Sequence, residues 1–205
     1  MKRLLIGTSN KGKAQFYSQV LNRFFPELEV VVPDELGVRV GVEEEGKTFE
    51  ENAIIKARAW ATASHLSTLS VDGGMMIDAL DGAPGVYTHR WAGEGTTDNE
   101  KLTFLLDQLR GVPRERRRAV WREVVALAKP NGQVITESAE DEGFILEAPV
   151  SLPNPWPGLW VVPVWFTTKF SKPWLALTPE EHEQVDSTYH AMRKLERKLY
   201  EFLLT

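Results

Sequence analysis

The feature that most constrains the fold of this sequence is a capped helix followed at once by a short buried strand, within residues 43–72. Thr48 and Glu51 have the spacing of a capping box, which predicts a helix that runs to about residue 64. Residues 68–72 are then an apolar run that ends in Asp72 and two glycines, as expected of a buried strand. A helix joined this closely to a strand favours an α/β fold.

Composition narrows the class of protein. The chain has 205 residues, 42% of them apolar and 26% charged, so we expect one packed domain over 1–205. A net charge of −5 argues against polymeric nucleic acid as a partner. The absence of cysteine excludes disulfides and thiolate metal sites. Apolar runs are too short for a membrane span or a signal peptide, so we expect a cytoplasmic protein with no membrane partner.

Near the N-terminus a strand, a small polar loop and a helix follow one another. Residues 3–8 (RLLIGT) are expected to form a short buried strand, and apolar side chains at helical spacing begin at Phe16. Backbone N–H groups and the helix dipole at such a junction favour a bound phosphate, whereas the alternative is an ordinary turn with solvated lysines. The candidate phosphate-binding residues are Thr8, Ser9, Asn10, Lys11, Gly12 and Lys13.

Charged residues of the opening stretch can complete such a site. If the fold brings Glu43 or Glu44 near Asp72 and Lys56, two carboxylates and a lysine converge. Such a group can hold Mg²⁺ and a phosphate chain. The alternatives are that the acids form a solvated face and that Asp72 begins a plain turn. Glu51 is already explained as part of the helix cap.

The rest of the chain adds strands and helices. An Asn-Gly pair at 131–132 predicts a hairpin. Five arginines between 114 and 122 predict a solvated loop that leads into a strand, rather than a nucleic-acid surface. Further helices are expected after Thr97 and from Thr178 to the C-terminal end. Extended segments are expected at 28–32, 38–42, 75–80, 119–128, 133–138, 143–146 and 160–167.

Several motifs occur in a recognisable order: TSNKGK, EEEGKTFEENAIIKARA, VDGGMMIDALDGAPGVY and TTDNEKL, followed less closely by VVALAKPNGQ and EGFI. Over roughly the first two thirds of the chain, this order resembles the inosine/xanthosine triphosphate pyrophosphatase family. The resemblance implies a mixed, twisted β-sheet flanked by helices in a single elongated domain, and a homodimer. It also implies Mg²⁺-dependent cleavage of a nucleoside triphosphate, a deaminated purine nucleotide, into a monophosphate and pyrophosphate.

The resemblance also assigns roles. The loop at residues 8–13 would bind the triphosphate, and Lys56 would contact phosphate. Glu44, or Glu43 if the register shifts, would be a Mg²⁺ ligand. Asp72 would ligate the metal and orient or deprotonate the attacking water. Gly73 stands where the family has a serine near the substrate. Mg²⁺ and two lysines would offset the ~4 negative charges of a triphosphate.

The sequence departs from the family pattern at Val71, where an acid is expected, and more widely in the last third. The family reads the purine 6-oxo group with an aspartate, a lysine and a Ser-His-Arg triplet. These are replaced here by Val162, His182, Asp186, Ser187 and Thr188. We therefore expect a pyrophosphatase of altered base specificity. The alternative is a nucleotide-binding protein with weak or no catalysis.

Three tryptophans near the replaced motif allow two interpretations. Trp156, Trp160 and Trp165 could stack on a base, or they could pack in the core or at a dimer contact. The second interpretation is favoured.

Overall fold

The computed structural model describes residues 2–153 and 158–204. Its first elements confirm the expected alternation of strands and helices. They are β1 (Lys2–Ile6), α1 (Lys11–Phe24), β2 (Leu28–Val31), α2 (Pro33–Leu36), α3 (Phe49–Ser64) and β3 (Thr68–Ile77). The later ones are α4 (Asp98–Gln108), β4 (Arg118–Ala128), β5 (Val134–Ile145), β6 (Trp165–Thr167), β7 (Lys172–Pro173), α5 (Pro179–Val185) and α6 (Ser187–Leu204).

Seven strands pair in the order β2-β1-β3-β4-β5-β6-β7, with parallel and antiparallel neighbours. This confirms the predicted α/β class with a mixed sheet. The chain divides into two compact units, and β3, β4 and β5 contribute residues to both. The first unit contains 1–72, 123–139 and 188–205, and the second contains 73–122 and 140–187.

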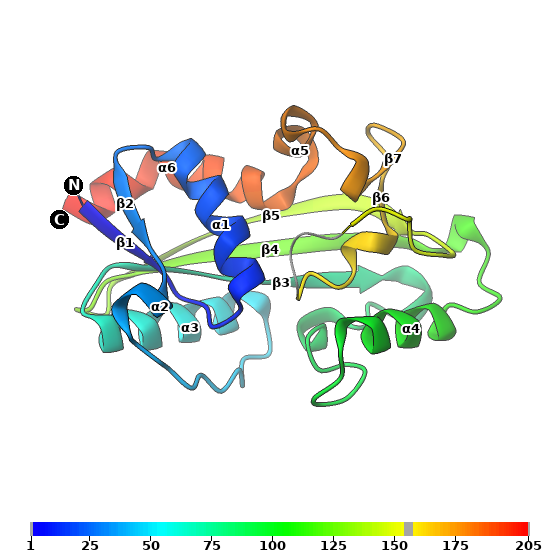
Figure 1. The fold of residues 1–205 in the computed structure, drawn as a ribbon, viewed down its shortest axis with the longest axis horizontal. Helices are drawn as coiled ribbons and strands as arrows, with labels where there is room; N and C mark the ends of the chain where they lie inside the picture. The colour runs from blue at the N-terminus through cyan, green and yellow to red at the C-terminus, as the bar shows by residue number, and fades with distance from the viewer. Residues whose placement is uncertain (1, 154–157, 205) are drawn as a thin grey trace. The chain divides into compact units, whose positions relative to one another are not determined.

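In the first unit, β1 is parallel to β2 on one side and to β3 on the other. Because parallel strands need crossover connections, which are right-handed, α1 and α3 cover opposite faces. Figure 1 draws α1 and α6 on one side of these strands and α3 on the other. The rings of Phe24 and Tyr189 lie 6.0 Å apart and join α1 to α6. Both faces are therefore covered, which is why Leu4, Leu5 and Ile6 are buried in succession.

The second unit contains the antiparallel strands β5, β6 and β7 together with α4 and α5. Phe144 of β5 stacks on Phe166 of β6 with ring centres 4.4 Å apart. Thr97 and Glu100 form the capping box predicted for α4.

The predicted Asn-Gly hairpin is also confirmed. Residues 131–132, which belong to the first unit, lie between β4 and β5, and these two strands are neighbours in the sheet.

The prediction of two strands on either side of Gly73 and Gly74 is wrong, since β3 runs without interruption from Thr68 to Ile77. Gly74 allows a close approach of another segment rather than a turn. A Cβ atom at Gly74 would press on Thr88 Oγ1 and lie 2.9 Å from the carbonyl oxygen of Gly85. The small residue therefore lets the 85–88 turn pack against the strand.

Several other elements begin or end at residues that differ from the sequence predictions. Residues 38–42 form no strand; their valines pack beside Trp60 instead. Residues 143–146 mostly continue β5, and the strand expected from 160 begins only at Trp165, after a 3₁₀ turn at Val162–Val164. The last helix is two helices, because Asp186 is extended between them. The N–H of Ser187 then donates to Asp141 Oδ2 at 2.5 Å, an anionic cap for α6.

The arginine cluster is largely structural. Arg117 is buried, contrary to the solvated loop expected, and donates to the carbonyl oxygens of Val112 and Leu109 at 2.8 Å each. The guanidinium groups of Arg118 and Arg122 form ion pairs with Glu142 and Glu140 at 3.1 and 3.0 Å. Arg114 lies over the ring of Phe144 at 4.4 Å. These contacts favour a packing role for the arginines over nucleic-acid binding.

Membrane-spanning helices are a separate question. Among the described residues, every helix is too short or too polar to span a bilayer.

Gly7 provides a test of the packing around β1. A Cβ atom there would press on Ser70 Oγ and lie 2.7 Å from Thr68 Cγ2 and 2.8 Å from Trp60 Cδ1. Gly7→Ala should therefore lower the free energy of unfolding by about 1–3 kcal/mol through overpacking. Gly41→Ala is the matched control, because a Cβ at Gly41 meets nothing within 4 Å. Urea denaturation of both variants measures the difference, and equal stabilities would contradict this packing.

Candidate active site

The acidic segment at 43–46 is hydrogen-bonded to the start of α3. The N–H of Gly46 donates to Asn52 Oδ1 at 2.8 Å, and the N–H of Lys47 donates to Glu51 Oε2 at 2.6 Å. Thr48 Oγ1 accepts from the N–H of Glu51 at 3.1 Å. One half of the predicted capping box is therefore present. The return bond from Glu51 goes to Lys47 instead of Thr48, and this ties the preceding segment to the helix.

Lys56 joins the two predicted carboxylates. Its Nζ lies 3.5 Å from Glu44 Oε1 and forms a short hydrogen-bonded ion pair with Asp72 Oδ1. The side chains of Lys56 and Asp72 are 11% and 8% exposed, whereas Glu44 is 33% exposed. Glu43 is an exposed neighbour on the same segment. The convergence expected from the sequence is present, and Glu44 is the acid that meets Lys56.

Asp72 is held where its carboxylate is costly to ionise. Burial raises the pKa of Asp72, while the charge and hydrogen bond of Lys56 oppose that rise and the nearby Glu44 adds to it. A buried carboxylate with a raised pKa and a lysine partner is a typical candidate for a general base. Gly73 follows Asp72 directly in β3 and is half-buried.

Lys13 supplies a second ammonium group, on a half-buried side chain. Burial is the main cause that lowers the pKa of Lys13, followed by repulsion from Lys56. The opposing effect comes first from Glu123 and then from Asp72 and Glu44, so the charges of four neighbouring side chains act on Lys13. Glu123, which is buried in β4, was not among the residues predicted for the site. An acid next to an apolar run of a strand, as here before Val124, is the sequence pattern that could have indicated it.

The polar loop at the start of α1 separates into two groups of residues. Asn10 caps the helix, since its Oδ1 accepts from the N–H of Lys13 at 2.9 Å, and Thr8 Oγ1 accepts from the N–H of Asn10 at 3.2 Å. The N–H groups of Lys11 and Gly12 lie before the first intrahelical bond and stay candidates for phosphate.

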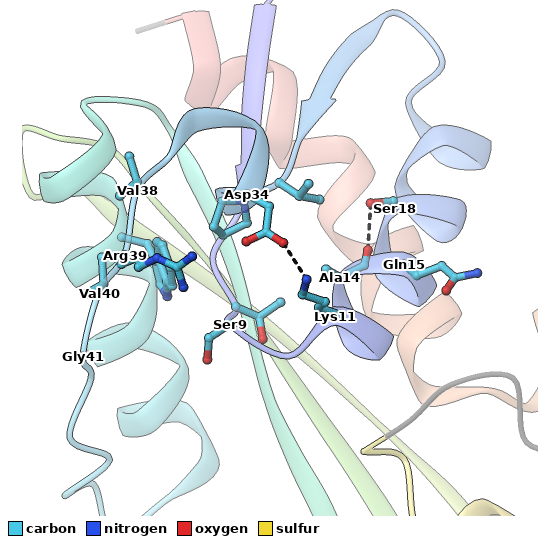
Figure 2. A pocket seen from close by; sticks show the side chains of 14 residues that line it. Ser9, Lys11, Ala14, Gln15, Ser18, Asp34, Val38, Arg39, Val40 and Gly41 are labelled. Carbon is cyan, nitrogen blue, oxygen red and sulfur yellow. Dashed lines mark hydrogen bonds and ion pairs between the residues drawn. The ribbon is translucent and has the colours of Figure 1, made fainter.

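Ser9 and Lys11 face a pocket of about 550 Å³ that the first unit forms beside this loop. Figure 2 shows Lys11 paired with Asp34 across the pocket, at 3.1 Å, and Arg39 pointing into it from the opposite wall. Val38, Val40 and Trp60 give the pocket apolar surface. Its lining contains none of Lys13, Glu44, Lys56 and Asp72, so these four form a separate group.

In the second unit, the residues that replace the family's base-reading groups are mostly buried. Val162 and Asp186 are 4% exposed each. The ring of His182 packs edge-on against Trp174 at 4.3 Å, and its Nδ1 lies 3.8 Å from Asp186 Oδ2. Burial lowers the pKa of His182 to about 4, against a smaller raising effect of Glu181. His182 is therefore neutral at pH 7 and does not restore the charge of the family's lysine.

The tryptophan prediction can be examined at two of its three positions. Trp160 and Trp165 are 4% and 2% exposed, which supports packing over stacking on a base. Trp156 lies outside the described residues.

His182 makes stability depend on pH. Burial lowers the pKa of His182 from 6.5 to about 4 in the folded chain. Between pH 6.5 and pH 4, the imidazole of His182 is therefore protonated in the unfolded chain but stays neutral in the folded chain. Stability is full above pH 6.5 and falls as the pH drops toward 4, by up to about 3 kcal/mol. His182→Gln should remove this component, so urea denaturation at pH 7.5 and pH 4 should show a smaller loss than in the wild type. Equal losses would contradict the burial of a neutral imidazole.

The donors present suit a hard divalent cation shared with phosphate. Among the residues that the structure describes, no cluster of three or more His, Cys, Asp or Glu side chains forms a complete metal cage. Two carboxylates, Glu44 and Asp72, converge on Lys56. Mg²⁺ is commonly held by one or two carboxylates, with substrate phosphates and water completing its octahedron. These two carboxylates could therefore hold Mg²⁺, with its other positions open to water and phosphate.

Comparisons with known proteins extend the resemblance over nearly the whole chain. The sequence model of the Ham1 family matches residues 4–198. The chain is 33% identical to a dITP/XTP pyrophosphatase of Bacillus cereus over 206 residues, which cover 100% of this chain and 98% of the relative. It is 40% identical to a dITP/XTP pyrophosphatase of Geobacter sulfurreducens over 149 residues, 73% of this chain and 74% of that one.

The solved structure of the Staphylococcus aureus Ham1 protein aligns with a TM-score of 0.80 at 28% identity. The alignment covers 98% of this chain and 99% of that protein. The family motifs found in the sequence cover only the first two thirds of the chain, whereas this alignment also covers the last third. The last third therefore shares the fold, although Val162, His182 and Asp186 differ from the residues that the family resemblance led us to expect.

Proposed function

The chain belongs to the Ham1 family, and from that premise we propose that it hydrolyses deaminated purine nucleoside triphosphates such as dITP and XTP to a monophosphate and pyrophosphate with Mg²⁺. The observation that carries the proposal is the bridge from Lys56 Nζ to Glu44 and Asp72, with the half-buried Lys13 within electrostatic reach. The enzyme class agrees with that of both relatives, which are dITP/XTP pyrophosphatases.

A charge count supports the divalent cation. Lys13 and Lys56 bring at most two positive charges, whereas Glu44, Asp72 and Glu123 bring three negative ones. The protein alone therefore cannot offset the ~4 negative charges of a triphosphate, and an added cation is needed. When bound, Mg²⁺ polarises the phosphate oxygens and offsets their charge. Glu44 and Asp72 are the residues that would hold it.

The chain's own residues supply the remaining chemistry. Asp72 orients a water molecule and takes its proton, a role that the raised pKa favours. The water oxygen forms a bond to the α-phosphorus, the bond from that phosphorus to the α,β-bridging oxygen breaks, and pyrophosphate leaves. Lys13 and Lys56 neutralise oxygens of the triphosphate as charge shifts toward the leaving group. The helix-terminal N–H groups of Lys11 and Gly12 bind the outer phosphates.

The catalytic assignment is tested by Asp72→Asn. The amide cannot accept the proton of water, so pyrophosphate release from dITP or XTP with Mg²⁺ should fall about 10²–10⁴-fold. Asp107→Asn, at an exposed ion pair on α4, should keep wild-type activity. Removal of divalent ions with EDTA should abolish turnover, and added Mg²⁺ should restore it. Activity of the Asp72 variant equal to that of Asp107→Asn would contradict the assignment.

The same assay separates the proposal from its alternative, a nucleotide-binding protein with weak or no catalysis. The specific observation behind that alternative is the replacement of the base-reading groups by a buried valine and a neutral histidine. Calorimetric binding of a non-hydrolysable analogue, with no turnover of any triphosphate, would favour the alternative.

Base discrimination is a further point of the proposal. A site that hydrogen-bonds its substrate rejects analogues by ~10⁴–10⁵, whereas apolar contacts discriminate only ~10–200-fold. We expect the ratio of kcat/KM for dITP over dATP to be about 10² or less in this chain, because Val162 and neutral His182 offer no charged contact to a 6-oxo group. A pyrophosphate-release assay over a panel of triphosphates measures the ratio. A value near 10⁴ would contradict this account of the replaced residues.

The proposal also retains a homodimer of one domain per chain, acting in the cytoplasm. These three points stay predictions.

A further inference from the structure

We propose that Asn52 is a positioning residue that sets Glu44 at its place beside Lys56 and Asp72. The inference rests on the proposed function, in which Glu44 and Asp72 hold Mg²⁺. Asn52 does not contact Lys56 or Asp72 through any hydrogen bond that the described residues form. It acts on the site through the acidic segment.

The contact that carries the proposal is the hydrogen bond from the N–H of Gly46 to Asn52 Oδ1, at 2.8 Å. Asn52 is fully buried, so water does not compete for this bond. Gly46 follows Glu44 by two residues, and Lys56 follows Asn52 by one turn of the same helix. One bond therefore fixes the backbone of the acidic segment relative to the ammonium group that Glu44 must meet.

The fit at this contact is tight. A Cβ atom at Gly46 would press on Asn52 Oδ1 and lie 2.8 Å from Glu51 Cβ and 2.9 Å from Asn52 N. The segment can reach the amide only because Gly46 has no side chain. Thr48 and Glu51 hold the residues that follow, but the bond at Gly46 is the one nearest to Glu44 among those that anchor the segment.

The two ends of the Asn52 amide have different roles. Oδ1 makes the bond to Gly46, whereas Nδ2 is buried and has no hydrogen-bond partner in the described part of the chain. The acceptor is therefore the part that positions the segment. A residue that keeps an oxygen there should keep the function, and a residue without one should lose it.

Three variants test this inference. Asn52→Ala removes the acceptor, and Asn52→Asp keeps an acceptor oxygen at the same position. Ala63→Gly weakens the same helix at an exposed position near its other end, away from the acidic segment, and serves as the control for a general loss of helix stability. The readouts are the Mg²⁺ concentration for half-maximal activity, Mn²⁺ binding without nucleotide by EPR, and exchange of the Gly46 amide proton by NMR.

In Asn52→Ala we expect the half-saturating Mg²⁺ concentration and the Mn²⁺ dissociation constant to rise about tenfold or more, with kcat at saturating Mg²⁺ much less affected. The Gly46 amide should exchange faster. Ala63→Gly should stay near the wild type in metal dependence, and Asn52→Asp should keep the slow exchange of the Gly46 amide proton because it retains the acceptor oxygen. A purely structural role predicts the same metal dependence in Asn52→Ala and Ala63→Gly, and this result would overturn the inference.

The outcomes separate this inference from the proposed function. If the wild type turned over no triphosphate, the proposed function would fail, while Mn²⁺ binding and Gly46 exchange would still report on Asn52. If the wild type bound no Mn²⁺, the ligand role of Glu44 would fail and the inference with it. If only kcat fell in Asn52→Ala, with the metal dependence unchanged, Asn52 would not position a metal ligand.

Discussion

The ion pairs of Lys56 with Glu44 and Asp72 are the interaction on which the candidate site depends. Two carboxylates this close repel each other, and the ammonium group between them makes their approach tolerable. The lysine comes from α3, Asp72 from β3, and Glu44 from a segment bound to the start of α3. The fold of the first unit thus assembles the candidate site from three neighbouring pieces of one short stretch of sequence.

A second lysine, Lys13, extends this arrangement. Lys13 lies at the start of α1, which crosses the opposite face of the parallel strands from α3, and its charge is supported chiefly by Glu123 of β4. The residue before Asp72, where the family resemblance led us to expect an acid, is the buried Val71. Among the neighbouring carboxylates, Glu123 raises the pKa of Lys13 most.

Much of this could be predicted from the sequence, because its signals are local. The helix cap at Thr48 and the Asn-Gly hairpin follow from short motifs. The residues alone predict that Glu43 or Glu44 can meet Lys56 and Asp72, and the family resemblance selects Glu44. What could not be predicted depends on tertiary contacts. Gly74 reads as a turn until the 85–88 segment packs against it, and Asp186 divides a helix whose apolar stripe continues through it. The contributions of Glu123 and Asn52 depend on their contacts in the fold: Glu123 acts on Lys13, and Asn52 accepts a hydrogen bond from Gly46.

Hydrolysis in ¹⁸O-labelled water is the most direct test of the central claim, that Asp72 directs water to the α-phosphorus of a triphosphate held with Mg²⁺. The account predicts that mass spectrometry of a single turnover of dITP finds one labelled oxygen in the monophosphate and none in the pyrophosphate. Label in pyrophosphate or in free phosphate would place the attack at another phosphorus and contradict the account.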